Sequence, residues 1–367
     1  MRVAIVHYWF TTWRGGEAVV KAIADIFPQA DLFAHVADPA LLARELPGRS
    51  VRTTFIGQLP GARRLYQKYL PLMPLALENL DLRRYDLVIS SEAGPAKGVI
   101  TRPETPHVTY CHSPMRYAWD MYHDYRETAS PLTRMFMGPM LHYMRAWDQL
   151  SAQRVDHFVA NSRFIAGRIR KFYRRDATVI YPPVDVAAFR THAHPEDYFL
   201  SVGQLVPYKR PDLLVDCFNE LGHPLRIIGD GPLLRRLRRR AKPNIVFLGR
   251  QPFDVIREHY SRCRALVFPG IEDFGIVPVE AMASGRPVIA FAGGGALETV
   301  IPDTTGVLFE EQSAAGLRGA ILRFESMQDR FAADALVSHA AKFSGARFRQ
   351  EFSEFLTGVM ASTGRTT

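Results

Sequence analysis

The chain has 367 residues, of which 47% are hydrophobic and 23% are charged. This composition is typical of a globular protein and excludes a disordered or fibrous one. At roughly 100–200 residues per domain, the length predicts two domains. The formal net charge of +9 leaves open an anionic membrane, a nucleic acid or an anionic substrate as partner, beside a surface whose arginines are merely solvated.

Cysteine usage and the first residues bear on the compartment. The three cysteines (Cys111, Cys217 and Cys263) are far apart in the sequence and lack the C-x2-C spacing of a metal site. We therefore expect reduced thiols in a cytoplasmic protein. Residues 1–8 lead directly into a strand pattern, so we expect no cleavable signal segment. No run reaches the about 18 apolar residues that a membrane-spanning helix needs.

The first half of the sequence alternates strand and helix patterns. Residues 3–6 form a short apolar run, typical of a strand that is buried on both faces. After a turn at residues 14–16, Val19, Ile23 and Ile26 recur at helical spacing, and Pro28 ends that predicted helix. The further strand candidates are residues 86–90, 107–111, 157–160 and 178–181. This alternation indicates the βαβ units of a doubly wound parallel sheet.

A break at residues 181–185 divides the chain, because its two prolines continue neither a helix nor a central strand. The same rhythm then restarts, with strand candidates at residues 199–202, 225–228, 245–248, 265–268, 288–291 and 306–309. The sequence predicts an α/β protein of two Rossmann-like domains that face a central cleft. We expect the first domain at residues 1–185 and the second at 186–344, with a C-terminal helix at about 345–367 packed back on the first.

The strongest functional signal is PGIEDFGIVPVEAMASGRPV at residues 269–288, directly after a predicted strand. Pro278 suits the first turn of a helix, and Gly285 ends that helix. Glu272 and Glu280 flank the turn, where carboxylates can accept hydrogen bonds from sugar hydroxyls. The backbone amides that form an anion site with the positive end of this helix are those of Phe274, Gly275, Ile276 and Val277. Alone, the spacing favours a charged loop and a glutamate that only complements the helix dipole.

The context of this stretch adds a resemblance to a known family. GQLVPYKRPD at residues 203–212 and GDGP at 229–232 follow predicted strands, and FLGR at 247–250 overlaps the end of the strand candidate 245–248. Together with the Glu-x7-Glu stretch, they resemble the retaining glycosyltransferases of family four (group 1), whose architecture is GT-B, two facing Rossmann-like domains. The resemblance covers nearly the whole chain.

The resemblance implies roles for residues of the second half. Lys209 is expected to hold the donor diphosphate as a point charge. The family's usual phosphate-binding arginine is replaced by Gln204, and Arg210 is available to supply that charge. Arg250 is expected to border the nucleotide base. The alternative for Lys209 is a surface lysine at a helix start, which the helix dipole disfavours.

Two segments of the first half also resemble the family. RGGE at residues 14–17 matches its glycine-rich loop, which implies that Gly16 approaches the donor and that Gly15 and Glu17 approach the acceptor. The alternative is a plain βα turn. HSPMRYAWD at residues 112–120 resembles the mannosyltransferase-like branch, which implies that His112 contacts the transferred sugar near the reacting carbon. Arg116 binds an acceptor phosphate or pairs with the aspartate four residues later.

Three basic segments concern the surface. Residues 59–76 and 131–150 interleave basic with aromatic and aliphatic residues, as in segments that lie in an anionic bilayer interface. Helices packed on a sheet give a similar pattern. The arginine run at 233–242 is interpreted as the solvated face of a helix whose leucines are buried. We expect peripheral contact with the anionic cytoplasmic face of the inner membrane.

These patterns lead to the hypothesis of a retaining, metal-independent hexosyltransferase without a cofactor. It moves mannose from the co-substrate GDP-mannose to a lipid-linked saccharide in surface polysaccharide synthesis. Glu280 binds the ribose, while Glu272 and His112 act on the transferred sugar as catalytic groups. A UDP-sugar or dTDP-rhamnose donor, a sugar-phosphate epimerase or phosphorylase, and a non-catalytic nucleotide-sugar binding protein remain open. Nucleic acid is disfavoured, because leucines rather than stacking aromatics interleave the arginine run.

Overall fold

A computed structural model describes residues 1–362, apart from the side chain of residue 128. Contacts divide the chain into two units, Met1–Pro183 together with the chain from Phe348, and Val184–Arg347. The boundary expected from the sequence lies two residues later, between residues 185 and 186. Helix α15 spans Gly345–Ser362; the expected extension of this helix to residue 367 lies outside the described residues.

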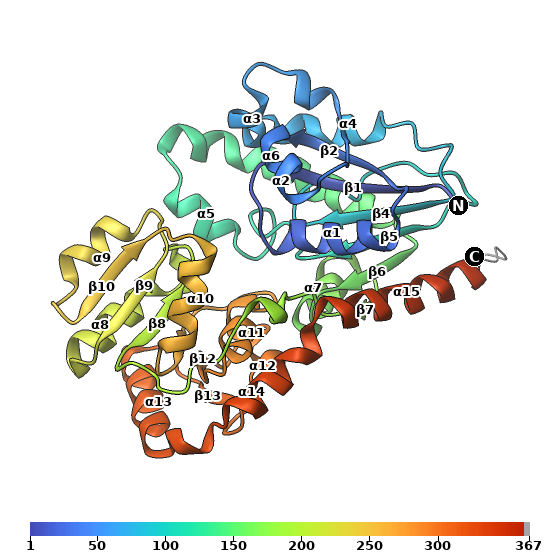
Figure 1. Cartoon of the computed structure of the whole chain (residues 1–367). Coiled ribbons are helices and arrows are strands. Elements are labelled where there is room, and N and C mark those ends of the chain that lie inside the picture. Colours follow the sequence, from blue (N-terminus) through green and yellow to red (C-terminus); the bar gives the residue numbers. More distant parts are fainter. Residues whose placement is uncertain (363–367) are drawn as a thin grey trace. The chain divides into compact units, whose positions relative to one another are not determined.

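The first unit contains a seven-stranded sheet of order β3-β2-β1-β4-β5-β6-β7, in which every neighbouring pair is parallel (Figure 1). Its strands are β1 Val3–Phe10, β2 Asp31–Ala37, β3 Val51–Thr53, β4 Leu87–Glu92, β5 His107–Cys111, β6 His157–Ala160 and β7 Ala177–Val179. Its helices are α1 Gly15–Ile26, α2 Pro39–Glu45, α3 Ala62–Leu65, α4 Met73–Glu78, α5 Tyr122–Thr128, α6 Pro131–Ala152, α7 Arg163–Tyr173 and α15.

Strand β1 shows why the first unit is a three-layer structure. Val3 and Ile5 pack into a core with α1, α2 and α15, whereas Ala4 and Val6 pack into a core with α4 and α6. Successive strand residues point to opposite faces, so a run without polar residues requires helices on both faces. Helix α15 contributes Phe352, which is fully buried, to the first of these cores, and it lies beside the strands of this unit (Figure 1).

The second unit contains a six-stranded parallel sheet of order β10-β9-β8-β11-β12-β13. Its strands are β8 Phe199–Val202, β9 Leu225–Ile228, β10 Ile245–Gly249, β11 Leu266–Phe268, β12 Val288–Phe291 and β13 Gly306–Phe309. Its helices are α8 Pro211–Leu221, α9 Leu234–Arg240, α10 Phe253–Arg262, α11 Ile276–Ala283, α12 Ala296–Thr299, α13 Ala314–Met327 and α14 Ala333–Ala340. Helices α8, α9 and α13 share one core with the strands, and α11 packs with α10, α12 and α14.

The two sheets confirm the predicted pair of doubly wound parallel sheets. Strands β5, β6, β8, β9, β12 and β13 have the predicted bounds. Two strands were missed. Strand β2 holds the buried His35 within its apolar run, and β3 has three residues, none of them buried. Helix α11 begins at Ile276, two residues before the proline expected at its start. The arginine run forms α9, in which Leu237 is buried, as interpreted from the sequence.

Candidate functional site

In the second unit the strand order reverses between β8 and β11, which are neighbours in the sheet although two strands separate them in sequence. The crossovers that leave these strands go to opposite sides, so their loops open a crevice at the carboxyl edge. The loop after β8 contains Gln204 and Lys209, and the loop after β11 contains Glu272. A small cavity at this edge is lined by residues of both loops, including these three.

The loops are joined by an ion pair. Nζ of Lys209 lies 2.6 Å from Oε1 of Glu272, and each side chain is 20% exposed. This Oε1 has no hydrogen-bond partner among the described residues, so the ammonium charge is its main compensation. Gly270 lets the loops approach so closely, because a Cβ at this position would lie 2.6 Å from the Cα of Lys209. The predicted cation and carboxylate are therefore brought together.

Glu280 lies one turn into α11, where Oε2 accepts a hydrogen bond of 2.8 Å from the Tyr260 hydroxyl. Burial raises the pKa of Glu280 to about 7, the tyrosine bond opposes this rise, and the charge of Glu272 adds to it. This carboxyl therefore takes up a proton at a higher pH than an ordinary glutamate does. Such a strongly shifted group near a second carboxylate, which itself pairs with a lysine, is typical of a functional site.

The turn before α11 is held by a segment that the sequence analysis did not single out. Gly275 has φ of 89° and precedes the helix, so the amides of Ile276 and Val277 are in the first helical turn, at its positive end. The turn after β12 braces it, because Gly295 N donates a 2.8 Å hydrogen bond to the carbonyl oxygen of Glu272. The glycines at residues 293–295 were the available signal.

Three other predicted donor residues lie around this edge. Gln204 is exposed in the loop after β8, and Arg250 is exposed directly after β10. Arg210 has φ of 51° and caps α8; it is paired with Asp212, with 3.0 Å between Nη2 and Oδ2. The guanidinium of Arg210 thus has a local partner, which a phosphate would have to displace or share.

In the first unit the strand order reverses between β1 and β4. His112 follows β5, which neighbours β4, and its Nε2 lies 2.8 Å from Oγ of Ser91. Burial, and secondarily His7, lowers the pKa of His112 to about 3, so the ring is neutral at physiological pH. Gly16 lies beside the His112 ring. A Cβ at Gly16 would lie 2.7 Å from the Tyr8 hydroxyl and 3.6 Å from His112 Nε2.

The predicted acceptor residues have structural partners. Gly15 is the first residue of α1. Glu17 is buried in the first turn of that helix, where its Oε2 accepts from the Arg14 amide at 2.9 Å. Arg116 is half-buried, and its Nε donates to Ser113 Oγ at 3.4 Å. Asp120, the alternative partner considered for Arg116, pairs with Arg168.

A buried ion cluster, which sequence analysis missed, lies under His112. Nζ of Lys97 contacts carboxylates of Glu92 and Asp148, and all three side chains are fully buried. Burial alone would lower the pKa of Lys97, but the two carboxylates raise it above the usual value. The carbonyl oxygen of Glu92 accepts from His112 N at 2.7 Å, and Trp119 Nε1 donates to Asp148 at 2.7 Å. The cluster therefore anchors both ends of the HSPMRYAWD segment.

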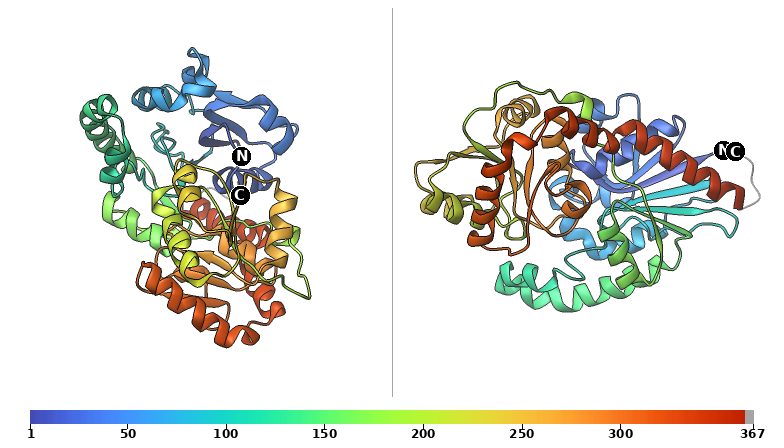
Figure 2. Two further views of the ribbon diagram at one scale, coloured as in Figure 1. Left: turned by 90° about the vertical axis from the view of Figure 1, so that its left-hand side faces the viewer. Right: turned by 90° about the horizontal axis from the view of Figure 1, so that it is seen from below.

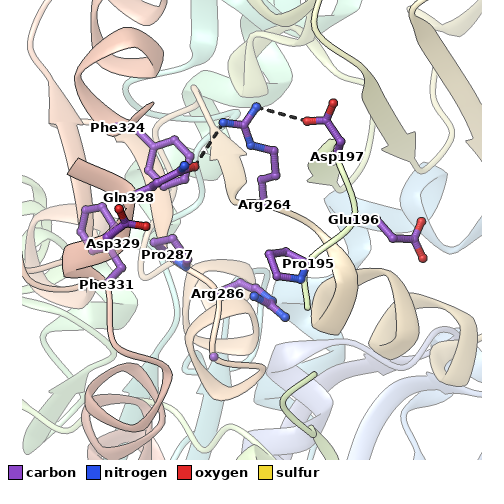
Figure 3. A pocket seen from close by; sticks show the side chains of 11 residues that line it. Pro195, Glu196, Asp197, Arg264, Arg286, Pro287, Phe324, Gln328, Asp329 and Phe331 are labelled. Atoms are coloured by element: carbon purple, nitrogen blue, oxygen red, sulfur yellow. Dashed lines mark hydrogen bonds and ion pairs between the residues drawn. The ribbon is translucent and has the colours of Figure 1, made fainter. Parts of the chain in front are cut away.

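A larger pocket of about 630 Å3 lies elsewhere in the second unit (Figure 3). Its residues precede β8, β11 and β12, so it lies at the amino edge of the sheet, away from the strand-end loops. Arg264 reaches across it to Asp197 and Gln328. Because this guanidinium is neutralised by the protein itself and the lining mixes both charges, the smaller cavity at Lys209 is the better candidate for an anionic ligand.

Family models match both halves of the chain, and individual relatives match part of it. The model for glycosyl transferases group 1 matches residues 187–342, and the model for Glycosyltransferase Family 4 matches residues 13–188. An uncharacterized glycosyltransferase of Methanocaldococcus jannaschii is 33% identical over 46% of this chain and 49% of its own length. An O-antigen chain mannosyltransferase of Salmonella typhimurium is 30% identical over 40% and 45%. A GDP-mannose-dependent alpha-(1-6)-phosphatidylinositol monomannoside mannosyltransferase of Mycobacterium tuberculosis is 30% identical over 43% and 46%. The chain thus spans about half the length of these relatives.

Solved structures share the fold over nearly the entire chain. The Anabaena protein HepE in complex with UDP and glucose is 19% identical and superposes with a TM-score of 0.73, covering 97% of this chain and 99% of HepE. Sucrose-phosphate synthase from Thermosynechococcus elongatus is 18% identical, with a TM-score of 0.73 over 99% and 100%. At these identities the likeness establishes the GT-B fold alone.

The raised pKa of Glu280 predicts a stability that depends on pH. Between the usual pKa of 4.5 and about 7, the folded state binds a proton that the unfolded chain has lost, so stability falls as pH rises through this window. Glu280→Gln keeps an acceptor for Tyr260 without a charge. We expect this variant to exceed wild type by about 1–3 kcal/mol in the free energy of unfolding at pH 8, and by less at pH 5.5.

Urea unfolding of both proteins at the two pH values measures this difference. Tyr260→Phe is the control, because it removes the hydrogen bond but leaves the carboxyl, and it should retain the wild-type pH slope or steepen it. An equal gain of Glu280→Gln at both pH values would contradict the shifted pKa.

Proposed function

We propose a function on a premise that the matched residues establish: the chain belongs to the group 1, or family 4, glycosyltransferases. The proposal is a retaining, metal-independent transfer of mannose from GDP-mannose to a lipid-linked saccharide at an anionic membrane, in surface polysaccharide synthesis. The observation that carries the donor site is the Lys209–Glu272 ion pair at the strand-order reversal of the second unit.

The ion pair supports this proposal because a bound phosphate can replace Glu272 as the partner of Lys209. In the proposed complex a diphosphate contacts the ammonium of Lys209 and the first turn of α11, whose amides favour an anion. When a phosphate oxygen pairs with Lys209, the Glu272 carboxylate loses its ion pair. It then accepts hydrogen bonds from hydroxyls of the transferred sugar. The ionised carboxylate of Glu280 accepts hydrogen bonds from ribose hydroxyls, and the protonated carboxyl can also donate one to them. Glu272 is thus kept from being a bare buried charge before the donor arrives.

The proposed reaction needs no protein nucleophile. The acceptor hydroxyl attacks the anomeric carbon from the face that the nucleotide leaves, the carbon–oxygen bond to the diphosphate breaks, and a leaving phosphate oxygen takes the hydroxyl proton. Lys209 and the α11 amides stabilise the charge that develops on the diphosphate, and His112 positions the sugar. Mannosyltransferases among the relatives support the choice of mannose.

An exposed apolar stripe on α6 supports the membrane part of the proposal. Leu132, Met135 and Phe136 are 67%, 63% and 62% exposed, at helical spacing beside the exposed Arg134. Helices α5 and α6 lie along one side of the first unit (Figure 2). Apolar side chains with basic neighbours are suited to an anionic bilayer interface. Among residues 1–362, no helix is long and apolar enough to span a bilayer.

The donor site is tested by nucleotide binding. Lys209→Ala should weaken the calorimetric affinity for GDP by about 10- to 100-fold, because one charge-assisted phosphate contact is lost. Lys242→Ala, which removes an exposed lysine of the same unit, is the matched control and should bind as wild type does. If both variants bind GDP equally well, Lys209 does not hold the diphosphate.

Turnover separates the alternatives. Wild type supplied with GDP-mannose and a polyprenyl-linked saccharide should release GDP in the presence of EDTA and give a product of retained anomeric configuration. Release of UDP or dTDP from the corresponding nucleotide sugars would show that GDP-mannose is not the donor. A product of inverted configuration would refute the retaining mechanism. Loss of activity in EDTA would refute metal independence. An isomerised sugar without nucleotide release would indicate an epimerase, and binding without turnover a non-catalytic protein.

The membrane surface is tested by co-sedimentation with vesicles of anionic phospholipid. Phe136→Glu should reduce the bound fraction several-fold, because it places a charge in the proposed interface. The control is Leu322→Glu, which alters an exposed apolar residue of α13 in the second unit. Equal binding of wild type and both variants would exclude the α6 stripe as the membrane contact.

A further inference from the structure

A line of four polar side chains runs from the start of α1 to His112. Oγ of Ser91 lies between two rings, 2.8 Å from His112 Nε2 and 3.1 Å from His7 Nδ1. The other ring nitrogen of His7, Nε2, is 3.9 Å from Oε1 of Glu17. His7, Glu17 and Ser91 are all buried, with exposed fractions of 1%, 2% and 0%. The sequence analysis had noted only the two ends of this line.

Hydrogen-bond accounting limits how the protons can be arranged along it. A serine hydroxyl has one proton and two lone pairs, so Ser91 donates to at most one of the two rings and can accept from a ring nitrogen that carries a proton. A neutral imidazole carries its proton on one nitrogen and a lone pair on the other. If His7 Nδ1 carries the lone pair, Ser91 donates its proton to His7. The contact between Ser91 and His112 is then a hydrogen bond only if His112 Nε2 carries the proton.

Glu17 decides between the two arrangements. His7 Nε2 has no hydrogen-bond partner among the described residues, and it lies 3.9 Å from the buried carboxylate of Glu17. A proton on Nε2 faces that carboxylate favourably, whereas a lone pair there would repel it, and water does not screen the interaction in a buried site. With the proton on Nε2, His7 Nδ1 accepts from Ser91, and Ser91 accepts from His112.

We propose that Glu17, His7 and Ser91 are positioning residues that fix His112 as the neutral tautomer protonated at Nε2, so that Nδ1 presents a lone pair to a hydroxyl of the transferred sugar. This inference rests on the proposed sugar transfer for the role of the lone pair, but the tautomer itself does not. Nδ1 has no hydrogen-bond partner among the described residues. His112 then orients the sugar as an acceptor and neither gains nor loses a proton.

The assignment changes the part of Glu17. Its Oε2 accepts from the Arg14 amide, so only Oε1 faces His7, and the carboxylate acts through the line rather than on a substrate directly. Glu17→Gln allows the same geometry, with the amide oxygen bonded to Arg14 and the amide NH2 facing His7. The NH2 group requires a lone pair on His7 Nε2, so His7 Nδ1 carries the proton and donates it to Ser91. The Ser91 proton is then free to bond a lone pair on His112 Nε2.

The tautomers are measured by long-range 1H–15N spectra of protein labelled at histidine, in which protonated and unprotonated ring nitrogens have separate shifts. The His112 signal is identified by its loss in His112→Asn. We expect an Nε2-protonated ring in wild type and an Nδ1-protonated ring in Glu17→Gln. An Nδ1-protonated His112 in wild type, or an unchanged tautomer in Glu17→Gln, would overturn the proposal.

Kinetics test the positioning role. Ser91→Ala frees the His112 ring to exchange tautomers, so kcat should fall about 10- to 100-fold while KM for the donor changes less than about 2-fold. Ser90→Ala is the matched control: it removes the preceding buried hydroxyl of β4, which bonds His107 and Thr109 instead. Equal loss of kcat in both variants would indicate a merely structural effect. Wild type with the expected tautomer but without sugar transfer would refute the proposed function and leave the tautomer assignment standing.

Discussion

Every strand pair in both sheets is parallel, and this constraint decides where chemistry is possible in the chain. A parallel sheet delivers the carboxyl end of each strand to one edge, and a reversal of strand order leaves a crevice there. In the second unit the reversal between β8 and β11 brings Lys209 to Glu272. In the first unit the reversal between β1 and β4 brings the start of α1 to Ser91 and, through β5, to His112.

Ionisable side chains are buried at both edges, and each buried charge needs a partner that compensates for the loss of water. Glu280 has a raised pKa beside Tyr260, while Glu272 is held by an ion pair that a phosphate can replace. Under His112, Lys97 and its two carboxylates are withdrawn from water, an arrangement that tolerates no missing partner. Through the Glu92 carbonyl oxygen and the Asp148 carboxylate, this cluster holds both ends of the HSPMRYAWD segment.

Features that depend on residues close in sequence could be predicted, whereas features that depend on residues far apart in sequence could not. Local patterns predicted most strands, and short motifs singled out Lys209, Glu272, Glu280 and His112. Strand β3 was missed because three exposed residues carry no periodicity. His7 and Ser91 could not be found either: each lies within a strand, 84 residues apart, and only strand pairing brings them together. Arg210 pairs with Asp212, only two residues away. From the sequence alone, an arginine at this position is interpreted equally well as a phosphate ligand.

The account depends on a nucleotide-sugar site at the carboxyl edge of the second sheet. Hydrogen–deuterium exchange with and without saturating GDP-mannose tests it directly, because bound phosphate protects the amides that it contacts. The account predicts slower exchange in two segments, residues 203–210 and 270–280, and no change in peptides that line the pocket around Arg264. Protection confined to that pocket, or absent from both strand-end segments while the nucleotide is bound, would contradict it.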